Sequence, residues 1–333
     1  MCNIIKIKPK PGKCICTISC IYNVLAFYGI EITEYEAYIL VDGFQTSFNK
    51  GYMALNSFEG IDENLRCTGG FQTTWLREET NKQKVITNSI MNGIPVIVLI
   101  DSTNLNFDER LKKEYGFLRS FIIYGIDLEK NYFSVYDTFY LNENQEFEVI
   151  HFTVPIDYLV NKAKEFLIIY PDRKNLIQYD YKKILVGNVV QYLENKSSSG
   201  IYEHYGVAAV KYHISYIQEI LAKNNEAEKL ETCYYATNTF LFGTFMPMAN
   251  YLLDFLKDYD LNNEDALINE LKTLKKNWNI LSNKVMKLTI SKKENQSLQF
   301  LYNYKQVFHS TLVFLRKLVE ILDDSILEGS IIC

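Results

Sequence analysis

Two closely spaced cysteines near the start of the chain have the setting in which thiols do nucleophilic chemistry. A turn at Pro11 and Gly12 leads into Cys14 and Cys16, and an apolar-periodic helix is predicted directly after them. The first turn of a helix has unpaired backbone N–H groups and the positive end of the helix dipole, and both favour a thiolate. Spacing alone makes either cysteine a candidate nucleophile.

The alternative for these cysteines is a structural role. Cysteine is among the most buried residue types and packs as a small hydrophobic side chain. Cys20 follows Cys16 by four residues, so both lie on the same helix face, and Cys20 is predicted to belong to the core. The residue pattern leaves open whether Cys14 or Cys16 is the nucleophile.

This segment resembles the butirosin-biosynthesis protein H-like acyltransferase family, a branch of the papain-like cysteine-peptidase superfamily. The similarity rests on four features: Cys16 at the helix start, Asn23-Val24-Leu25 within two turns, Gly29-Ile30 at the helix end, and Thr33-Glu34 at the next cap. It extends over the N-terminal half of the chain. The resemblance implies a papain-like fold.

The same resemblance implies an acyltransferase or amide-bond-forming enzyme of natural-product biosynthesis. Such an enzyme moves an acyl group from a carrier-protein thioester through an acyl-cysteine to an amine. The implied partners are an acyl or peptidyl carrier protein and a small-molecule or peptidyl amine acceptor. No cofactor is expected beyond the acyl-phosphopantetheine that the carrier protein brings as substrate. We also expect no metal site, because Cys14, Cys16 and Cys20 lack a second Cys/His pair at zinc-type spacing.

Catalysis of this kind requires a base and an orienting acid. Asp137 ends the predicted strand Tyr132–Tyr136 and matches the family's Val-Tyr-Asp element, although an aspartate there is also a common strand-terminating residue. The base in that family is a histidine five or six residues before a strand glycine. In this chain that glycine is Gly125, and the matching positions hold Arg119 and Ser120.

An arginine in the histidine position changes the predicted chemistry. Arg119 stays protonated and cannot accept a proton, but it can lower the pKa of a nearby thiol and pair with Asp137. All four histidines follow Asp137 in the sequence, and we expect surface or packing roles for them: His151, His204, His213 and His309.

Two interpretations of the function remain. The first is a slow acyltransferase that uses Cys16, or Cys14 if the register differs, with Arg119 and Asp137. The second is a catalytically impaired family member, with the catalytic histidine replaced, that binds a carrier protein or acts as a scaffold. A cysteine peptidase is a weaker alternative, because a long helical region follows and no secretion signal opens the chain.

The elements that must position these residues predict an α+β first domain. One helix at the cysteines is followed by helices near residues 34–41 and 85–91, while residues 44–80 are predicted to form short strands and loops. Continuous apolar runs predict buried strands, two of which form a hairpin. The predicted strands cover residues 95–100, 118–127, 132–137, 147–152 and 166–170.

A change of pattern after residue 171 predicts a second domain. Residues 171–177 read as a linker, and long apolar-periodic segments follow at 184–194, 205–223, 226–259, 264–286 and 292–324. We therefore predict a papain-like domain over residues 1–172 and an all-helical domain over residues 178–333.

Composition limits the partners and the compartment. The 333 residues have a formal net charge of −5, which argues against nucleic acid as the main partner. The odd number of cysteines, seven, suggests thiols in a reducing cytosol, and no signal peptide or run of about 18 apolar residues is present. We expect a cytoplasmic protein without membrane contact, and the sequence leaves the oligomeric state open. Lys6, Lys8, Lys10 and Lys13 are candidates for docking an acidic carrier protein, or form a solvated face.

Overall fold

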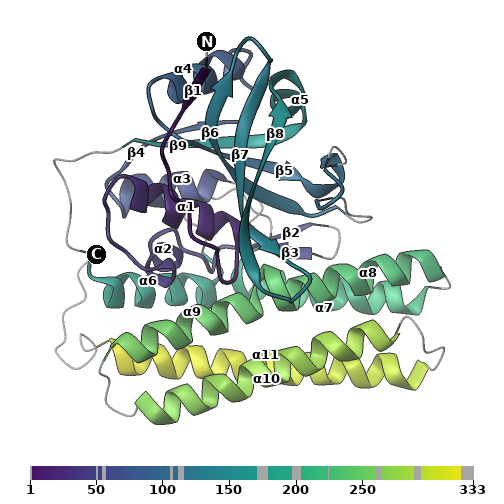
Figure 1. Cartoon of the computed structure of the whole chain (residues 1–333). Coiled ribbons are helices and arrows are strands. Elements are labelled where there is room, and N and C mark those ends of the chain that lie inside the picture. Colours follow the sequence, from purple (N-terminus) through teal and green to yellow (C-terminus); the bar gives the residue numbers. More distant parts are fainter. Residues whose placement is uncertain are drawn as a thin grey trace. The chain divides into compact units, whose positions relative to one another are not determined.

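The computed structural model is a mixed α+β protein, which confirms the predicted fold class at that level (Figure 1). It describes residues 2–49, 52–54, 58–105, 108–111, 116–170, 179–196, 204–223, 225–259, 264–288 and 294–323. The chain divides into two compact units. The first unit contains Met1–Val41 and Ser57–Tyr179, and the second contains Asp42–Asn56 and Asp180–Cys333.

An antiparallel sheet of seven strands, counted over the described residues, forms the centre of the first unit. The strand order is β4-β9-β5-β6-β7-β8, and β1 pairs with β6 beside this path. The strands are β1 (Cys2–Ile4), β4 (Gln72–Leu76), β5 (Val96–Asp101), β6 (Leu118–Asp127), β7 (Tyr132–Leu141), β8 (Phe147–Pro155) and β9 (Ala163–Tyr170).

The central strands are those with continuous apolar sequence. Five of the six residues of β5 are fully buried between β6 and β9, as expected for a strand covered on both faces. The predicted hairpin is also confirmed, because β6 and β7 pair antiparallel across a turn in which Asn131 has a φ of +59°. Asparagine tolerates this left-handed conformation better than most residues.

Helices pack on both faces of this sheet. Alternate residues of a strand point to opposite faces, so Val96 and Val98 share a core with α4 (Lys82–Met91) and α5 (Ile156–Lys162). Phe121 of β6 belongs to the same core, whereas its neighbour Ser120 points to the other face. On that face α1 (Cys16–Phe27) contacts β6 and β7.

Helix α2 (Glu34–Leu40) begins with the capping box that the sequence predicts. The Thr33 hydroxyl accepts a hydrogen bond from the Glu36 N–H at 3.2 Å, and the Glu36 carboxylate accepts one from the Thr33 N–H at 2.6 Å. These two bonds satisfy N–H groups that a helix start leaves unpaired. The local sequence signal was therefore sufficient to fix where this helix begins.

Helix α3 (Phe58–Cys67) is a correction to the sequence prediction, which was short strands and loops over residues 44–80. Phe58, Ile61 and Leu65 lie at helical spacing and are buried, but Gly60 weakens the local signal. The helix start is held by a distant residue, because the Phe58 N–H donates to the buried Glu165 carboxylate at 2.5 Å. Sequence patterns cannot reveal that contact.

The described part of residues 180–323 contains helices and no strand. The helices are α6 (Tyr181–Glu194), α7 (Gly206–Ala222), α8 (Glu226–Asn238), a π-helical segment η2 (Thr239–Gly243), α9 (Phe245–Asp258), α10 (Glu264–Leu288) and α11 (Glu294–Leu322). None of the described helices combines the length and hydropathy needed to cross a bilayer. The predicted linker at 171–177 and most of residues 107–115 lie outside the described residues.

The apolar-periodic segment over residues 226–259 contains two helices, α8 and α9, separated by η2, and a hairpin docks at this break. Strands β2 (Ser47–Asn49) and β3 (Tyr52–Ala54) belong to the second unit, although we predicted that this segment was in the first domain. The Met53 N–H donates to the Thr239 hydroxyl at 2.9 Å, and the Thr244 hydroxyl donates to the Met53 carbonyl at 3.1 Å.

Asp42 starts this docked segment and is a buried carboxyl, and Gln45, Phe44 and Tyr205 favour its charged form less than burial disfavours it. Its backbone has a φ of +50°, and the Tyr205 hydroxyl donates to Oδ2 at 3.5 Å. The other carboxyl oxygen, Oδ1, has no hydrogen-bond partner among the described residues. Burial raises the pKa of Asp42 from its ordinary 3.8 to about 7.

The raised pKa of Asp42 predicts a loss of stability as pH increases. The neutral Asp42 side chain contributes to the free energy of unfolding fully below the unfolded-state pKa, and this contribution is lost as pH rises through the folded-state pKa of about 7. The shift corresponds to a contribution of about 4 kcal/mol. Asp42→Asn imitates the neutral acid, so the free energy of unfolding of the variant minus that of the wild type should grow between about pH 4 and 7. Urea denaturation across this range measures the difference. A constant difference would contradict the assignment.

Candidate functional site

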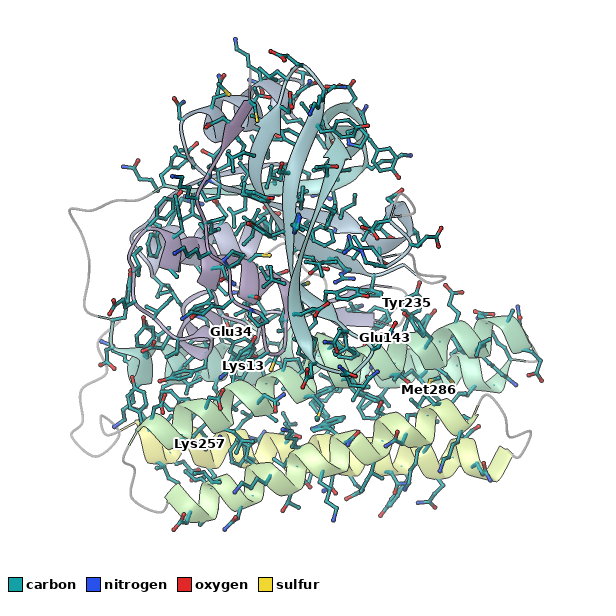
Figure 2. All side chains as sticks on the ribbon, viewed as in Figure 1. Lys13, Glu34, Glu143, Tyr235, Lys257 and Met286 are labelled. Atoms are coloured by element: carbon teal, nitrogen blue, oxygen red, sulfur yellow. The ribbon has the colours of Figure 1, made fainter. Side chains whose placement is uncertain are left out.

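The loop before α1 is fixed by hydrogen bonds at three points. Asn23 accepts from the Lys10 N–H at 2.7 Å and donates to the Lys10 carbonyl at 3.0 Å. The Gly12 N–H donates to the Thr138 carbonyl at 2.7 Å. The Lys13 N–H donates to both oxygens of the buried Glu34 carboxylate at 3.1 Å, and Figure 2 shows these two residues close together. The loop that contains Cys14 and leads to Cys16 is therefore held in place by these hydrogen bonds.

Gly12 is required because the loop passes very close to the helix it precedes. A Cβ at this position would lie 2.5 Å from the Cβ and Oγ of Ser19 and 3.3 Å from the Phe139 ring. Ser19 cannot retreat easily, since its hydroxyl donates to the Thr138 hydroxyl at 2.8 Å. The turn that the sequence indicated is therefore clamped between α1 and β7.

Cys16 is the first residue of α1 and lies against the start of β6. Its Sγ accepts a hydrogen bond from the Ser120 N–H at 3.4 Å. Beside it, the hydroxyls of Thr17 and Ser120 are hydrogen-bonded at 2.6 Å. Cys16 is partly exposed, whereas Ser120 is fully buried. The structure therefore brings the predicted Cys16 to the strand that carries the predicted Arg119.

Arg119 and Asp137 form a buried ion pair on neighbouring strands. The Arg119 guanidinium donates to Asp137 Oδ2 and, at 3.1 Å, to the Phe139 carbonyl. The second carboxyl oxygen of Asp137 accepts from the Phe139 N–H at 2.8 Å. The Asp137 side chain is 0% exposed and that of Arg119 is 7% exposed. Both carboxyl oxygens of Asp137 are thus held by donors.

Burial decides the protonation state of the Cys16 thiol. It raises the pKa of Cys16 above its ordinary value, and the Asp137 charge acts in the same direction. The positive charge of Arg119 and the Ser120 N–H lower this pKa without reversing the effect of burial. The resting form at neutral pH is the thiol, so proximity to a helix start does not by itself produce a thiolate.

The other two cysteines of this segment are buried. Cys14 precedes α1 by two residues and is 6% exposed. Cys20 is fully buried, as the sequence predicted, and its Sγ lies 3.8 Å from the Thr138 hydroxyl. Burial raises the pKa of Cys20 well above its ordinary value. Of the three, Cys16 is the residue that is partly exposed, and its thiol lies within the influence of the Arg119 and Asp137 charges.

His151, the histidine of the first unit, is not placed to act as a base for Cys16. His151 of β8 pairs in register with Tyr136 and is exposed, and it points to the sheet face opposite that of Asp137. His213 is buried in the second unit and bonded to the Tyr304 hydroxyl at 2.7 Å. The remaining two lie on or near helices of the second unit: His204, stacked on Tyr212, and His309, exposed on α11.

Some polar residues of the site carried no sequence signal. Thr17, Ser19, Ser120 and Thr138 form a buried set of hydroxyls between α1 and the strands. Their spacing within each element is unremarkable, and they meet only when α1 packs on the sheet. Over the described residues, no group of three His, Cys, Asp or Glu side chains lies together to hold a metal ion.

Comparison with known proteins leaves the family open. A scan against protein-family models gives no match, and a search of curated proteins finds no similar sequence. The functional argument therefore rests on the geometry of the site.

The raised pKa of Cys16 predicts slow alkylation of its thiol near neutral pH. With iodoacetamide at about pH 7.5, Cys16 should react more slowly than the exposed Cys2 and Cys67, since only the thiolate is the nucleophile. Its rate should rise steeply towards about pH 9.5. Peptide mass spectrometry measures each site, and selective rapid labelling of Cys16 at neutral pH would contradict the prediction.

The buried ion pair predicts an asymmetric response to mutation. Arg119→Met leaves the Asp137 carboxylate buried without its cation and should cost roughly 3–5 kcal/mol of unfolding free energy. The double variant with Asp137→Leu should recover part of that loss. Arg110→Met is the control, because Arg110 is half exposed in its pair with Asp108 and its loss should cost under about 1 kcal/mol. Equal losses for Arg119→Met and Arg110→Met would contradict the argument.

Proposed function

We propose that the chain is a catalytically impaired member of the papain-like, acyltransferase-type family. In this proposal the first unit binds a carrier-protein thioester beside Cys16 and does not transfer its acyl group efficiently. The observation that carries the proposal is the buried Arg119–Asp137 pair. A permanently protonated side chain occupies the place where a base would accept the thiol proton.

The family assignment draws support from three coincident features. A cysteine opens a helix that packs on an antiparallel sheet, and its thiol lies beside the strand that carries Arg119. Asp137 lies on the next strand and pairs with the residue in the expected histidine position. The resemblance implies a nucleophile, a base and an acid in this order along the chain. Cys16 and Asp137 match the first and the last, and Arg119 replaces the histidine that would be the base.

The hydrogen bonds of Asp137 support the proposal that Arg119 replaces the histidine. An orienting acid needs an oxygen that accepts from the base. Here Arg119 takes one oxygen and the Phe139 N–H takes the other. Since positioned general acid–base groups contribute roughly 10²–10⁴-fold to rate, a site without one retains binding better than turnover.

Slow acyl transfer is the second candidate, and the partial exposure of Cys16 favours it. A thioester is already activated, and Arg119 lowers the barrier to forming the thiolate by its charge. An amine acceptor would then need to lose its proton to solvent. Both candidates have a carrier protein as partner, and for either one a cytoplasmic location remains our expectation.

Replacing the arginine by histidine tests the proposal. Arg119→His restores a side chain that can accept the thiol proton next to Asp137, so acylation of Cys16 by an acyl-pantetheine thioester should accelerate by about 10²-fold or more. Intact-protein mass spectrometry follows the acyl-enzyme. Arg119→Gln is the matched control, because it removes the charge without adding a base and should give no acceleration.

Two further results separate the candidates. Cys16→Ser should abolish the adduct in every background, whereas Cys20→Ala should leave it. Turnover by the wild type at the rate of Arg119→His would reject the impaired assignment and support the transferase. No acylation of Arg119→His, with its fold confirmed by circular dichroism, would reject the papain-like assignment itself.

A further inference from the structure

Two helices of the second unit have a charge opposite to that of the whole chain. The chain has a net charge of −5. Beyond Glu270, however, α10 contains five lysines and no acidic residue up to its end at Leu288. Helix α11 has three basic and no acidic residues between Asn295 and Val319. The two helices therefore form a basic segment within an acidic protein.

These two helices lie antiparallel and in contact. The Lys317 ammonium pairs with Glu270 at 2.7 Å, and the Trp278 indole N–H donates to the Thr311 hydroxyl at 3.1 Å. These contacts join the start of α10 to the end of α11 and the middle of one helix to the middle of the other. Figure 1 shows the pair running side by side.

A line of exposed lysines follows α10 at helical spacing. Lys272, Lys276, Lys284 and Lys287 are all exposed, and their separations of three, four or eight residues keep them on one side of the helix. The opposite side of α10 is buried and includes Trp278. The lysines therefore face away from the core of this unit.

Large apolar side chains are exposed on both helices. Leu298 is 65% exposed and Tyr302 is 60% exposed, one helical turn apart on α11. Ile280 and Met286 of α10 are also among the exposed hydrophobic residues, and Met286 is labelled in Figure 2. Scattered exposed apolar residues are normal, but apolar residues flanked by charges of one sign are typical of an interaction surface.

Helix stability does not account for this pattern. Like charges one turn apart, such as Lys272 and Lys276, repel each other and destabilise a helix. Solvated protein surfaces intersperse both signs of charge, which reduces that cost. The part of α10 that follows Glu270 has five lysines and no carboxylate, so negative charge from outside the helix would complement it.

We propose that this basic face, formed by Lys272, Lys276, Lys284, Lys287, Leu298 and Tyr302, docks an acidic amphipathic helix of a partner protein. Such a helix presents carboxylates at one-turn spacing beside an apolar stripe, and both features complement the face. The inference goes beyond the function proposed above, because it concerns the second unit and needs no chemistry at Cys16.

Charge and composition favour a protein helix over the two other anionic surfaces. Nucleic-acid interfaces are polar and strongly positive, whereas Leu298 and Tyr302 are the most exposed large apolar residues of this face. A helix that binds a membrane buries a continuous apolar side in the lipid, but the apolar sides of α10 and α11 are buried in the protein.

The test is fluorescence anisotropy with a labelled helical Glu/Leu peptide, compared with a matched peptide in which Gln replaces Glu. Lys276→Gln, Lys284→Gln and Lys287→Gln together should weaken binding of the acidic peptide by roughly 10-fold. The charge-matched control changes Lys183, Lys211 and Lys229, on α6, α7 and α8, to Gln and should alter binding by less than about 2-fold. Replacing Lys276, Lys284 and Lys287 by arginine should retain binding of the acidic peptide, because the positive charge is kept.

Each remaining outcome decides against the proposal. Equal affinity for the Glu and Gln peptides, or equal weakening by the two triple variants, would overturn it. A DNA duplex or phosphatidylserine vesicle that binds the face more tightly than the acidic peptide would assign the face to that class instead. Leu298→Ser with Tyr302→Ser must also weaken peptide binding, since a purely electrostatic contact would not respond to that change.

Discussion

The buried ion pair between Arg119 and Asp137 is the interaction on which the candidate site depends. A charge taken out of water is stable only if its partner and its remaining hydrogen bonds are in place. Here the partner lies on the adjacent strand, and the Phe139 backbone supplies the remaining donor and acceptor. The pair ties β6 to β7 beside the irregular register that follows Asp137. It also sets the electric field at the thiol of Cys16, where the charges of Arg119 and Asp137 oppose each other.

Hydrogen bonds around that pair fix the position of the Cys16 thiol in the first unit. The loop before α1 is bonded to Asn23, to Glu34 and to the carbonyl of Thr138. Hydroxyl contacts then join α1 to the strands on the same face. Such a frame positions a nucleophile well, yet desolvation keeps it protonated. Positioning and activation are separate properties: the hydrogen bonds above fix the position of Cys16, and in the proposed function Arg119 cannot supply the activation.

Elements with local signals were predicted correctly from the sequence. The capping box of α2, the buried run of β5 and the hairpin of β6 and β7 each have their cause within a few residues. Helix α3 was missed, and the hydrogen bonds at the break between α8 and α9 carried no local signal, because a distant residue makes the contact in each case. Glu165 fixes the start of α3, and Met53 hydrogen-bonds to the threonines on either side of the break.

By itself, the sequence determined that a cysteine opens a helix and that a strand leads into Asp137, because residue identity and short-range periodicity act locally. The strand end that we predicted at Asp137 is wrong, since β7 continues to Leu141. The expectation of a histidine at position 119 came from the family resemblance alone. Only the tertiary structure decided that Arg119 pairs with Asp137, that the Cys16 thiol lies beside the strand of Arg119, and that burial raises the pKa of this thiol. The reason is physical: pairing and desolvation depend on which groups surround an atom in space, and those groups come from distant parts of the chain.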